Sequence, residues 1–129
     1  MTGDGNLDAV VTMFNSTASV YLGNGHGGLT LSQQNIYYPA PDFIPLQVGD
    51  VNGDGIPDIL LPADGSIGIA LGKGNGTFLK PTAFGAGPGE GQILLQNLHA
   101  QSPTSGLPDL VAPDSTGGVM VLINLTKPK

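Results

Sequence analysis

The 129-residue sequence predicts an all-β fold, and both its composition and its internal repetition indicate this class. It contains 21 glycines and 11 prolines, although 40% of its residues are apolar. Helical bundles exclude glycine and proline from their interiors, whereas short strands joined by turns accommodate both. A sequence pattern also recurs about every 50 residues, a period typical of repeated supersecondary units. We therefore expect many short antiparallel strands and no helical core.

The repeat is visible as three segments that align with one another: "TGDGNLDAVV" (2–11), "NGDGIPDILL" (52–61) and "PTSGLPDLVA" (103–112). The alignment places Asp8, Asp58 and Asp109 in register. Downstream, "SVYLGNGHGGLTL" (19–31) aligns with "GIALGKGNGTFLK" (68–80). Periods near 50 residues are typical of propellers and arrays, in which no single repeat buries its own faces. We assign repeats to residues 1–44, 45–91 and 92–129 of one domain, 1–129.

Within the second repeat, apolar segments separated by turn residues predict four antiparallel strands, at 46–48, 58–61, 67–71 and 77–84. The third strand alternates large and small residues, so Ile67, Ile69 and Leu71 share one face. Pro81 confines the fourth strand to a sheet edge, because proline has no N–H to donate. Over the whole chain the pattern predicts about ten strands, with the first repeat lacking its first strand and the third its last.

Four-stranded antiparallel repeats of this kind are β-propeller blades, and the sequence supplies about 2.5–3 of them. A closed ring of at least four blades needs about 200 residues or more. Either the sequence belongs to a longer chain, or copies associate head to tail to close the ring. Two copies would then form a six-bladed ring.

Charge and composition exclude several kinds of partner. Four lysines face ten acidic residues, for a net charge of −6. Nucleic-acid and anionic-membrane binders carry the opposite imbalance. No apolar run reaches the roughly 18 residues of a membrane-spanning helix, and cysteine is absent. We expect neither a nucleic-acid partner nor membrane insertion.

The most informative segment is the acidic loop from Asp50 to Asp58. Asp50, Asn52, Asp54 and Asp58 occupy positions one, three, five and nine, and Ile56 offers its carbonyl at position seven. Ca²⁺ takes six to eight oxygen ligands at about 2.3–2.6 Å, which suits this spacing. Mg²⁺ prefers to keep its waters, and Zn²⁺ prefers Cys and His ligands. The alternative is a metal-free turn, because Asp, Asn and Gly are also ordinary turn residues.

The sequence "DVNGDGIPD" (50–58) followed by "ILLPA" resembles the calcium-loop motif of the FG-GAP/VCBS repeat family. Such repeats build the β-propellers of integrin α-subunits, some fungal lectins and many bacterial secreted proteins. The resemblance implies one Ca²⁺ in the loop between the first two strands of a blade. Its ligands would be Asp50, Asn52, Asp54, the Ile56 carbonyl and Asp58.

The first repeat contains an incomplete version of this loop. Thr2, Asp4, the Asn6 carbonyl and Asp8 match positions three, five, seven and nine. Position one falls just before Met1. Either the sequence is cut after a natural Asp, which we expect, or this loop binds calcium weakly.

The third loop has lost its carboxylates, with Gln101, Pro103 and Ser105 at positions one, three and five. We expect it to bind no calcium. Asp109 then keeps a structural role, capping the N–H groups of a turn.

Other candidate sites are weaker. "GNGHGG" (23–28) matches G-x-G-x-x-G, but no helix follows it, so we interpret it as a hairpin turn. No acid–base pair or activated nucleophile is evident, so we predict no enzyme activity. Tyr37, Tyr38 and Phe43 either pack between blades or form a platform on which a sugar stacks.

Together these features predict a secreted or cell-surface calcium-binding module for adhesion or for carbohydrate or protein recognition. The alternative is a non-binding scaffold repeat within a larger secreted protein or enzyme.

Overall fold

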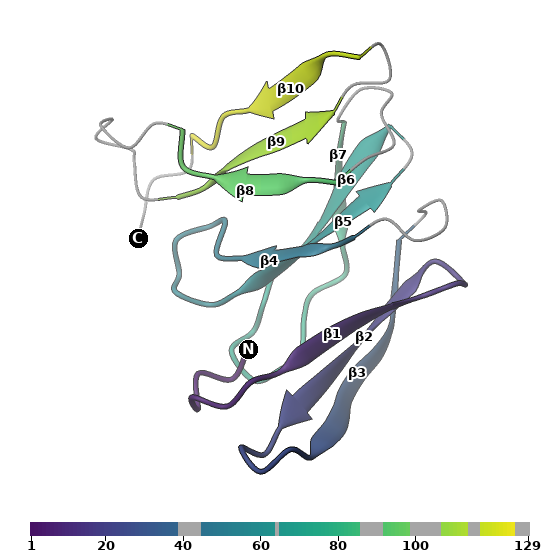
Figure 1. Cartoon of the computed structure of the whole chain (residues 1–129), viewed down its shortest axis with the longest axis vertical. Coiled ribbons are helices and arrows are strands. Elements are labelled where there is room, and N and C mark those ends of the chain that lie inside the picture. Colours follow the sequence, from purple (N-terminus) through teal and green to yellow (C-terminus); the bar gives the residue numbers. More distant parts are fainter. Residues whose placement is uncertain (39–44, 64, 86–91, 99–106, 114–116, 126–129) are drawn as a thin grey trace.

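The computed structural model of the chain consists of three small antiparallel sheets stacked one on another (Figure 1). The structure describes residues 1–38, 45–63, 65–85, 92–98, 107–113 and 117–125. The strands of the first sheet are β1 (Ala9–Met13), β2 (Thr17–Gly23) and β3 (Leu29–Tyr37), those of the second are β4 (Gln47–Gly49), β5 (Asp58–Ala63), β6 (Ser66–Ala70) and β7 (Thr82–Gly85), and those of the third are β8 (Leu94–Gln96), β9 (Asp109–Pro113) and β10 (Val119–Leu122).

The all-β prediction and the strand pattern are confirmed. The second sheet is complete, with strand order β4-β5-β6-β7. The first sheet has no strand corresponding to β4, and the described part of the third has none corresponding to β7. The partners of β5 and β9 show the repeat in register, because Gly49 pairs with Asp58 and Gln96 pairs with Asp109. Each sheet is therefore one blade-like unit.

The prediction of a fourth strand at residues 77–84 was wrong for residues 77–81. Only Thr82–Gly85 forms β7, while Phe78 makes an isolated bridge to Gly72. Pro81 separates the two parts because it cannot donate a ladder hydrogen bond. Its predicted place at a sheet edge is confirmed, since β7 is the last strand of its sheet.

The glycine-rich segment 23–28 is the hairpin turn that the sequence predicts. It joins β2 to β3, and the Asn24 N–H donates to the Gly28 carbonyl at 3.1 Å. The segment therefore leads into a strand and not into a helix.

The second sheet is buried on both faces, and all six residues of β5 are buried. Successive side chains of a strand point to opposite faces. Ile59 and Leu61 therefore face the first sheet, while Leu60 faces the third. The cluster between the first and second sheets consists of Ala18, Val20, Ile36, Tyr38, Ile59, Leu61, Ala70 and Phe78. The cluster between the second and third consists of Val51, Leu60, Ile67, Ile93 and Leu110.

The predicted shared face of Ile67, Ile69 and Leu71 is confirmed. Ile67 belongs to the cluster between the second and third sheets, and the other two pack against it.

Polar contacts also link neighbouring sheets. The Gln33 side chain of β3 accepts a hydrogen bond from the Phe78 N–H at 2.6 Å and donates to the Phe78 carbonyl at 3.4 Å. The Asn124 amide donates to the Val51 carbonyl at 2.8 Å. Apolar packing is not directional, so these hydrogen bonds help to fix the position of each sheet relative to its neighbour.

We predict that Leu61→Ala lowers the free energy of unfolding by about 2–5 kcal/mol, because Leu61 is fully buried between two sheets. Leu79→Ala is the matched control, since Leu79 is 48% exposed, and we expect a change within about 0.5 kcal/mol. Urea unfolding followed by circular dichroism measures both. Equal effects of the two substitutions would contradict the packing described here.

Candidate metal centre

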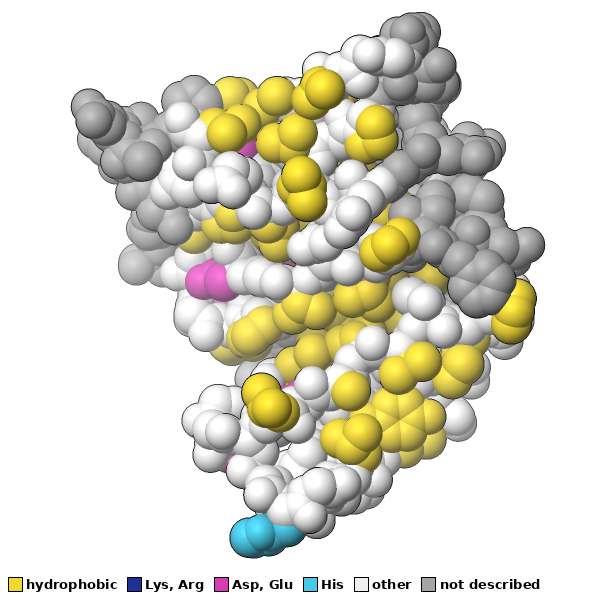
Figure 2. Space-filling view, in the orientation of Figure 1, with side chains coloured by type: hydrophobic (Ala, Val, Ile, Leu, Met, Phe, Trp, Pro, Cys, Tyr) yellow, Lys and Arg dark blue, Asp and Glu magenta, His cyan; other side chains and the backbone are white. Residues whose placement is uncertain are grey.

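The β4–β5 loop contains the predicted acidic site, at the left of the second sheet in Figure 1. The Asp50 carboxylate organises it. One oxygen accepts hydrogen bonds from the Asn52 N–H at 3.2 Å and the Gly53 N–H at 2.7 Å, and the other accepts from the Gly55 N–H at 2.8 Å. The loop thus winds tightly around its first carboxylate. Acidic side chains are visible at this edge in Figure 2.

The next two polar side chains each close a turn with the backbone two residues on. Asn52 Oδ1 accepts from the Asp54 N–H at 2.9 Å, and Asp54 Oδ1 accepts from the Ile56 N–H at 2.8 Å. Gly53 and Gly55 take positive φ angles of 79° and 80°, a region open to glycine without steric cost. Alternating Asx and Gly residues therefore produce the sharp winding that the sequence predicts.

Asp58 closes the loop from inside the protein, where it is fully buried. Its Oδ2 accepts from the Val51 N–H at 3.0 Å and its Oδ1 from the Gly72 N–H at 2.8 Å. Burial raises the pKa of this carboxyl, and the charges of Asp54 and Asp50 raise it further, while the two N–H donors act in the opposite direction. The ionised carboxylate thus lacks full charge compensation.

The same junction recurs in the other two sheets. Asp8 accepts from the Gly23 N–H at 3.0 Å, and Asp109 accepts from the Asn124 N–H at 2.8 Å. Gly23 is the last residue of β2, and Asn124 lies two residues after the end of β10. In both sheets the donor therefore stands at or just after the end of the strand that pairs with the strand beginning at or beside the aspartate. The second donor to Asp109 is the Leu98 N–H at 2.9 Å. The predicted capping role of Asp109 is confirmed.

In the first loop the second hydrogen-bond donor to the aspartate, Asp8, is a charged group. The Met1 ammonium lies 2.6 Å from Asp8 Oδ2, where the second sheet has the Val51 N–H. The hydrogen bond from this ammonium lowers the pKa of Asp8. Asp4 accepts from both the backbone and the side chain of Asn6, at 2.9 and 3.0 Å.

Thr2 supplies one unsatisfied oxygen in this first loop. Its Oγ1 is buried and has no hydrogen-bond partner. Thr2 matches position three of the acidic loop, the position of Asn52 in the second repeat. In the third loop, Gln101, Pro103 and Ser105 lie outside the described residues.

The chemistry of the second loop fits a hard cation. All five predicted ligands offer oxygen, and each of the three carboxylate groups keeps at least one lone pair that accepts no N–H. No lysine of the described residues forms an ion pair with Asp50, Asp54 or Asp58. In the described ranges, however, no group of three Asp, Glu, His or Cys side chains is close enough together to hold a metal ion. Metal ligation therefore requires the loop oxygens to converge further.

The aromatic residues separate into different environments. Tyr38 is buried in the cluster between the first and second sheets, so it packs between blades and is unavailable for stacking on a ligand. Tyr37 is exposed on β3. Phe43 lies outside the described residues.

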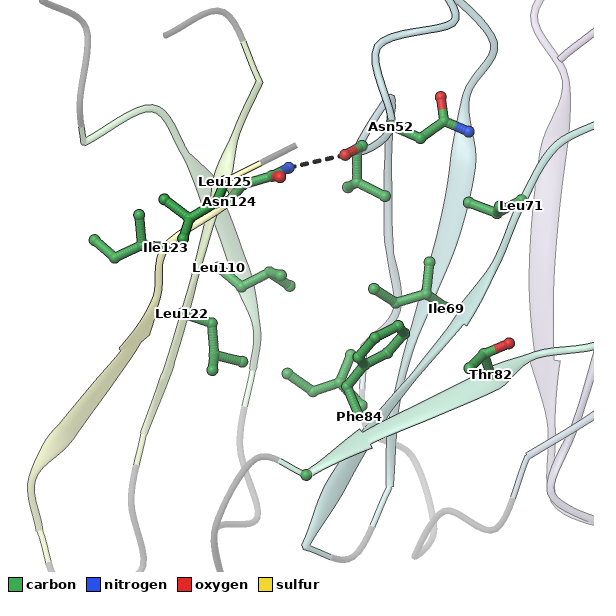
Figure 3. A pocket seen from close by; sticks show the side chains of 13 residues that line it. Asn52, Ile69, Leu71, Thr82, Phe84, Leu110, Leu122, Ile123, Asn124 and Leu125 are labelled. Atoms are coloured by element: carbon green, nitrogen blue, oxygen red, sulfur yellow. Dashed lines mark hydrogen bonds between the residues drawn. The ribbon is translucent and has the colours of Figure 1, made fainter. Parts of the chain in front are cut away.

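A cavity of about 710 Å³ lies between the second and third sheets (Figure 3). Ile69 and Phe84 line one side, and Leu110 and Leu122 line the other. Between the first two sheets, Phe78 fills the gap as part of the core. Asn52 of the acidic loop lies at the edge of this cavity.

Three blade-like sheets with one loop–aspartate junction each define a β-propeller-type repeat module. Comparison with protein families agrees with this class. A family model of FG-GAP-like repeats matches residues 1–61 and again residues 50–94, and the chain belongs to the FG-GAP-like repeat family. Repeats of this family are generally structural or binding modules. Neither the curated proteins nor the solved structures gave a match. Among the described residues, no helix is long and apolar enough to cross a membrane.

Sequence reasoning missed the donors that complete each junction. Gly23, Gly72 and Asn124 follow the second aligned strand of their repeats, and two of them align as glycines. The reason for glycine is steric. A Cβ on Gly72 would clash with the Pro57 carbonyl oxygen, so glycine lets the backbone approach closely enough for this N–H to reach Asp58.

We predict that Gly72→Ala lowers the free energy of unfolding by about 1–3 kcal/mol, because the added methyl group overpacks against the acidic loop. Gly85→Ala is the control, since a Cβ there meets nothing within 4 Å. Thermal melts of both variants measure the difference. Equal melting temperatures would contradict the close approach at Gly72.

We also predict that Asp109→Ala lowers the free energy of unfolding by about 2–4 kcal/mol, because buried N–H groups lose their acceptor. The loss should be the same with calcium and with a chelator. Asp4→Ala, at an exposed position, should change stability by less than about 1 kcal/mol in the chelator. A calcium-dependent effect of Asp109→Ala would show that the third loop binds metal after all.

Proposed function

We propose that the β4–β5 loop binds one Ca²⁺ and that the chain is a calcium-stabilised recognition module of an extracellular protein. One observation carries the calcium proposal. Three carboxylates, those of Asp50, Asp54 and Asp58, lie in one short loop with no lysine of the described chain paired to them. Like charges at such spacing repel one another unless a cation compensates them.

The residues that would hold the ion are Asp50, Asn52, Asp54, the Ile56 carbonyl and Asp58. Bound calcium supplies the positive charge that the buried Asp58 lacks. The chain's own contribution is to pre-wind the loop through the Asx turns and to anchor Asp58 to Val51 and Gly72. Because the wound loop forms only in the folded chain, calcium binding adds to the free energy of folding.

The first loop is the weaker candidate site. Its ligands would be Thr2, Asp4, the Asn6 carbonyl and Asp8. The unpartnered Thr2 oxygen favours a ligand there. This loop offers only two carboxylates, however, where the second loop has three, so there is less negative charge for a cation to neutralise.

The recognition role and the extracellular setting rest on the family and on the metal chemistry. Calcium sites of extracellular modules have Kd values of about 10⁻⁴–10⁻³ M. A loop with a modest affinity for calcium would therefore suit that setting. The ligand would be a carbohydrate or a protein. The competing proposal is a scaffold repeat that binds no ligand and supports a larger protein.

The calcium proposal predicts a titration with one binding event and a melting temperature that falls in EDTA. At calcium roughly 100 times the Kd, the stabilisation would be about 2.7 kcal/mol. Asp54→Asn should abolish most of this dependence, because it removes one charge and keeps the side-chain shape.

Asp4→Asn is the matched control, since Asp4 occupies the same position of the incomplete first loop. We expect it to leave the main calcium event in place. An empty calorimetric titration of the unaltered chain, together with an unchanged melt in EDTA, would end the calcium proposal.

A glycan array probed with calcium present separates recognition from scaffolding. Binding that disappears in EDTA would support a calcium-dependent lectin-like module. No binding to any sugar, with no protein captured at the same calcium concentration, would favour the scaffold.

A further inference from the structure

The two ends of the sheet stack expose apolar faces that are not part of either core cluster. On the first sheet, the large apolar side chains of β1 to β3 that point away from the second sheet are those of Val11, Met13, Tyr21, Leu29 and Leu31, and we call them the β1 face. Ala9, Thr17, Ser19 and Tyr37 lie on the same side of the sheet. Val10, on the opposite side of β1, packs against the core. Val11 and Met13 are each 42% exposed. Tyr21 pairs with Leu31 across β2 and β3, so these side chains share one surface.

The third sheet exposes a similar surface at the other end. Its β10 face consists of Leu94, Val111, Val119 and Val121. Leu94 and Val121 both pair with Val111, so the three form one row across the sheet. Leu110 and Leu122, on the opposite side, pack toward the second sheet. Figure 2 shows hydrophobic side chains gathered over the first and third sheets.

The repeat register shows what each face is built to contact. Val11 corresponds to Leu61 of the second sheet, three residues after the aligned aspartate in both repeats. Leu61 packs against the first sheet. The β1 face therefore has the positions with which the second sheet contacts the sheet before it.

The β10 face corresponds to the other side of the second sheet. Val111 matches Leu60, two residues after the aligned aspartate in both repeats. Leu60 belongs to the cluster that joins the second sheet to the third. The β10 face therefore has the positions with which a sheet contacts the sheet after it.

From this correspondence we propose that the β10 face of one copy of this chain packs against the β1 face of a second copy. The contact would continue the two interfaces already present between successive sheets. The residues named for the two faces are apolar, which agrees with the depletion of charged residues in interface cores. Exposed apolar patches of this kind mark interaction sites in soluble proteins.

The contact is head to tail, because both internal interfaces join unlike faces. Such heterologous contacts generate a ring if the rotation closes and a filament if it does not. Two copies would supply six sheets, enough for a closed ring.

Sedimentation velocity and light scattering test the proposal. The unaltered chain should have a mass that is a multiple of 13.1 kDa and should dissociate on dilution. Val11→Asp, on the β1 face, and Val121→Asp, on the β10 face, should each give monomers. Leu79→Asp is the control, since Leu79 is similarly exposed but lies in the segment between β6 and β7 of the middle repeat, and its assembly should be unchanged.

Mixing the two face variants distinguishes the head-to-tail contact from any other. The Val11→Asp chain keeps its β10 face and the Val121→Asp chain keeps its β1 face. An equal mixture should therefore form a dimer through the one intact contact, although each variant alone is monomeric. Failure of the mixture to associate would overturn the head-to-tail arrangement.

A monomeric unaltered chain at every concentration would overturn the proposal entirely. Circular dichroism and melting of each variant show that it is folded. If either variant is unfolded, Leu31→Asp and Leu94→Asp supply a second pair on the same two faces. The proposal does not rest on calcium, so loss of the calcium proposal leaves it standing, and the reverse also holds.

Discussion

The buried aspartate at the start of the second strand of each blade is the constraint on which the rest of the structure depends. Asp8, Asp58 and Asp109 each accept hydrogen bonds from two segments, one that precedes the aspartate and one that lies 14 or 15 residues after it. A buried carboxylate without such donors would be strongly unfavourable, so the surrounding segments must converge on it. The aspartate therefore sets the place of the loop, the strand and the following hairpin together.

This junction has a different charge balance in each sheet. In the first, a terminal ammonium faces the carboxylate. In the second, burial raises the pKa of Asp58, and the negative charges of Asp54 and Asp50 raise it further. In the third, positions one, three and five of the loop have no carboxylate, so Asp109 is its only acidic residue. One backbone arrangement thus supports loops that differ in their number of carboxylates.

Much of the fold could be predicted because the repeat contains its own register. The alignment of the three aspartates predicted the order of the strands and the absence of one strand from the first and third repeats. The alternation of large and small residues in 67–71 predicted the face that packs against the third sheet. The first half of 77–84 could not be placed, since an apolar pattern does not show where Pro81 interrupts pairing. The donors from Gly72 and Asn124 were missed because their distance from the aspartate is set by the hairpin length. Whether a metal binds depends on how closely the loop oxygens approach one another in space. The spacing of Asp and Asn residues along the sequence indicates such a site but does not determine that arrangement.

The most direct test is amide hydrogen exchange at Gly72 and Asn124, measured by NMR with calcium and with a chelator. The account predicts that both amides exchange slowly, as donors to buried carboxylates, and that calcium slows exchange at Gly72 while leaving Asn124 unchanged. Exchange at both as fast as in the exposed Asn24–Gly28 turn would contradict it.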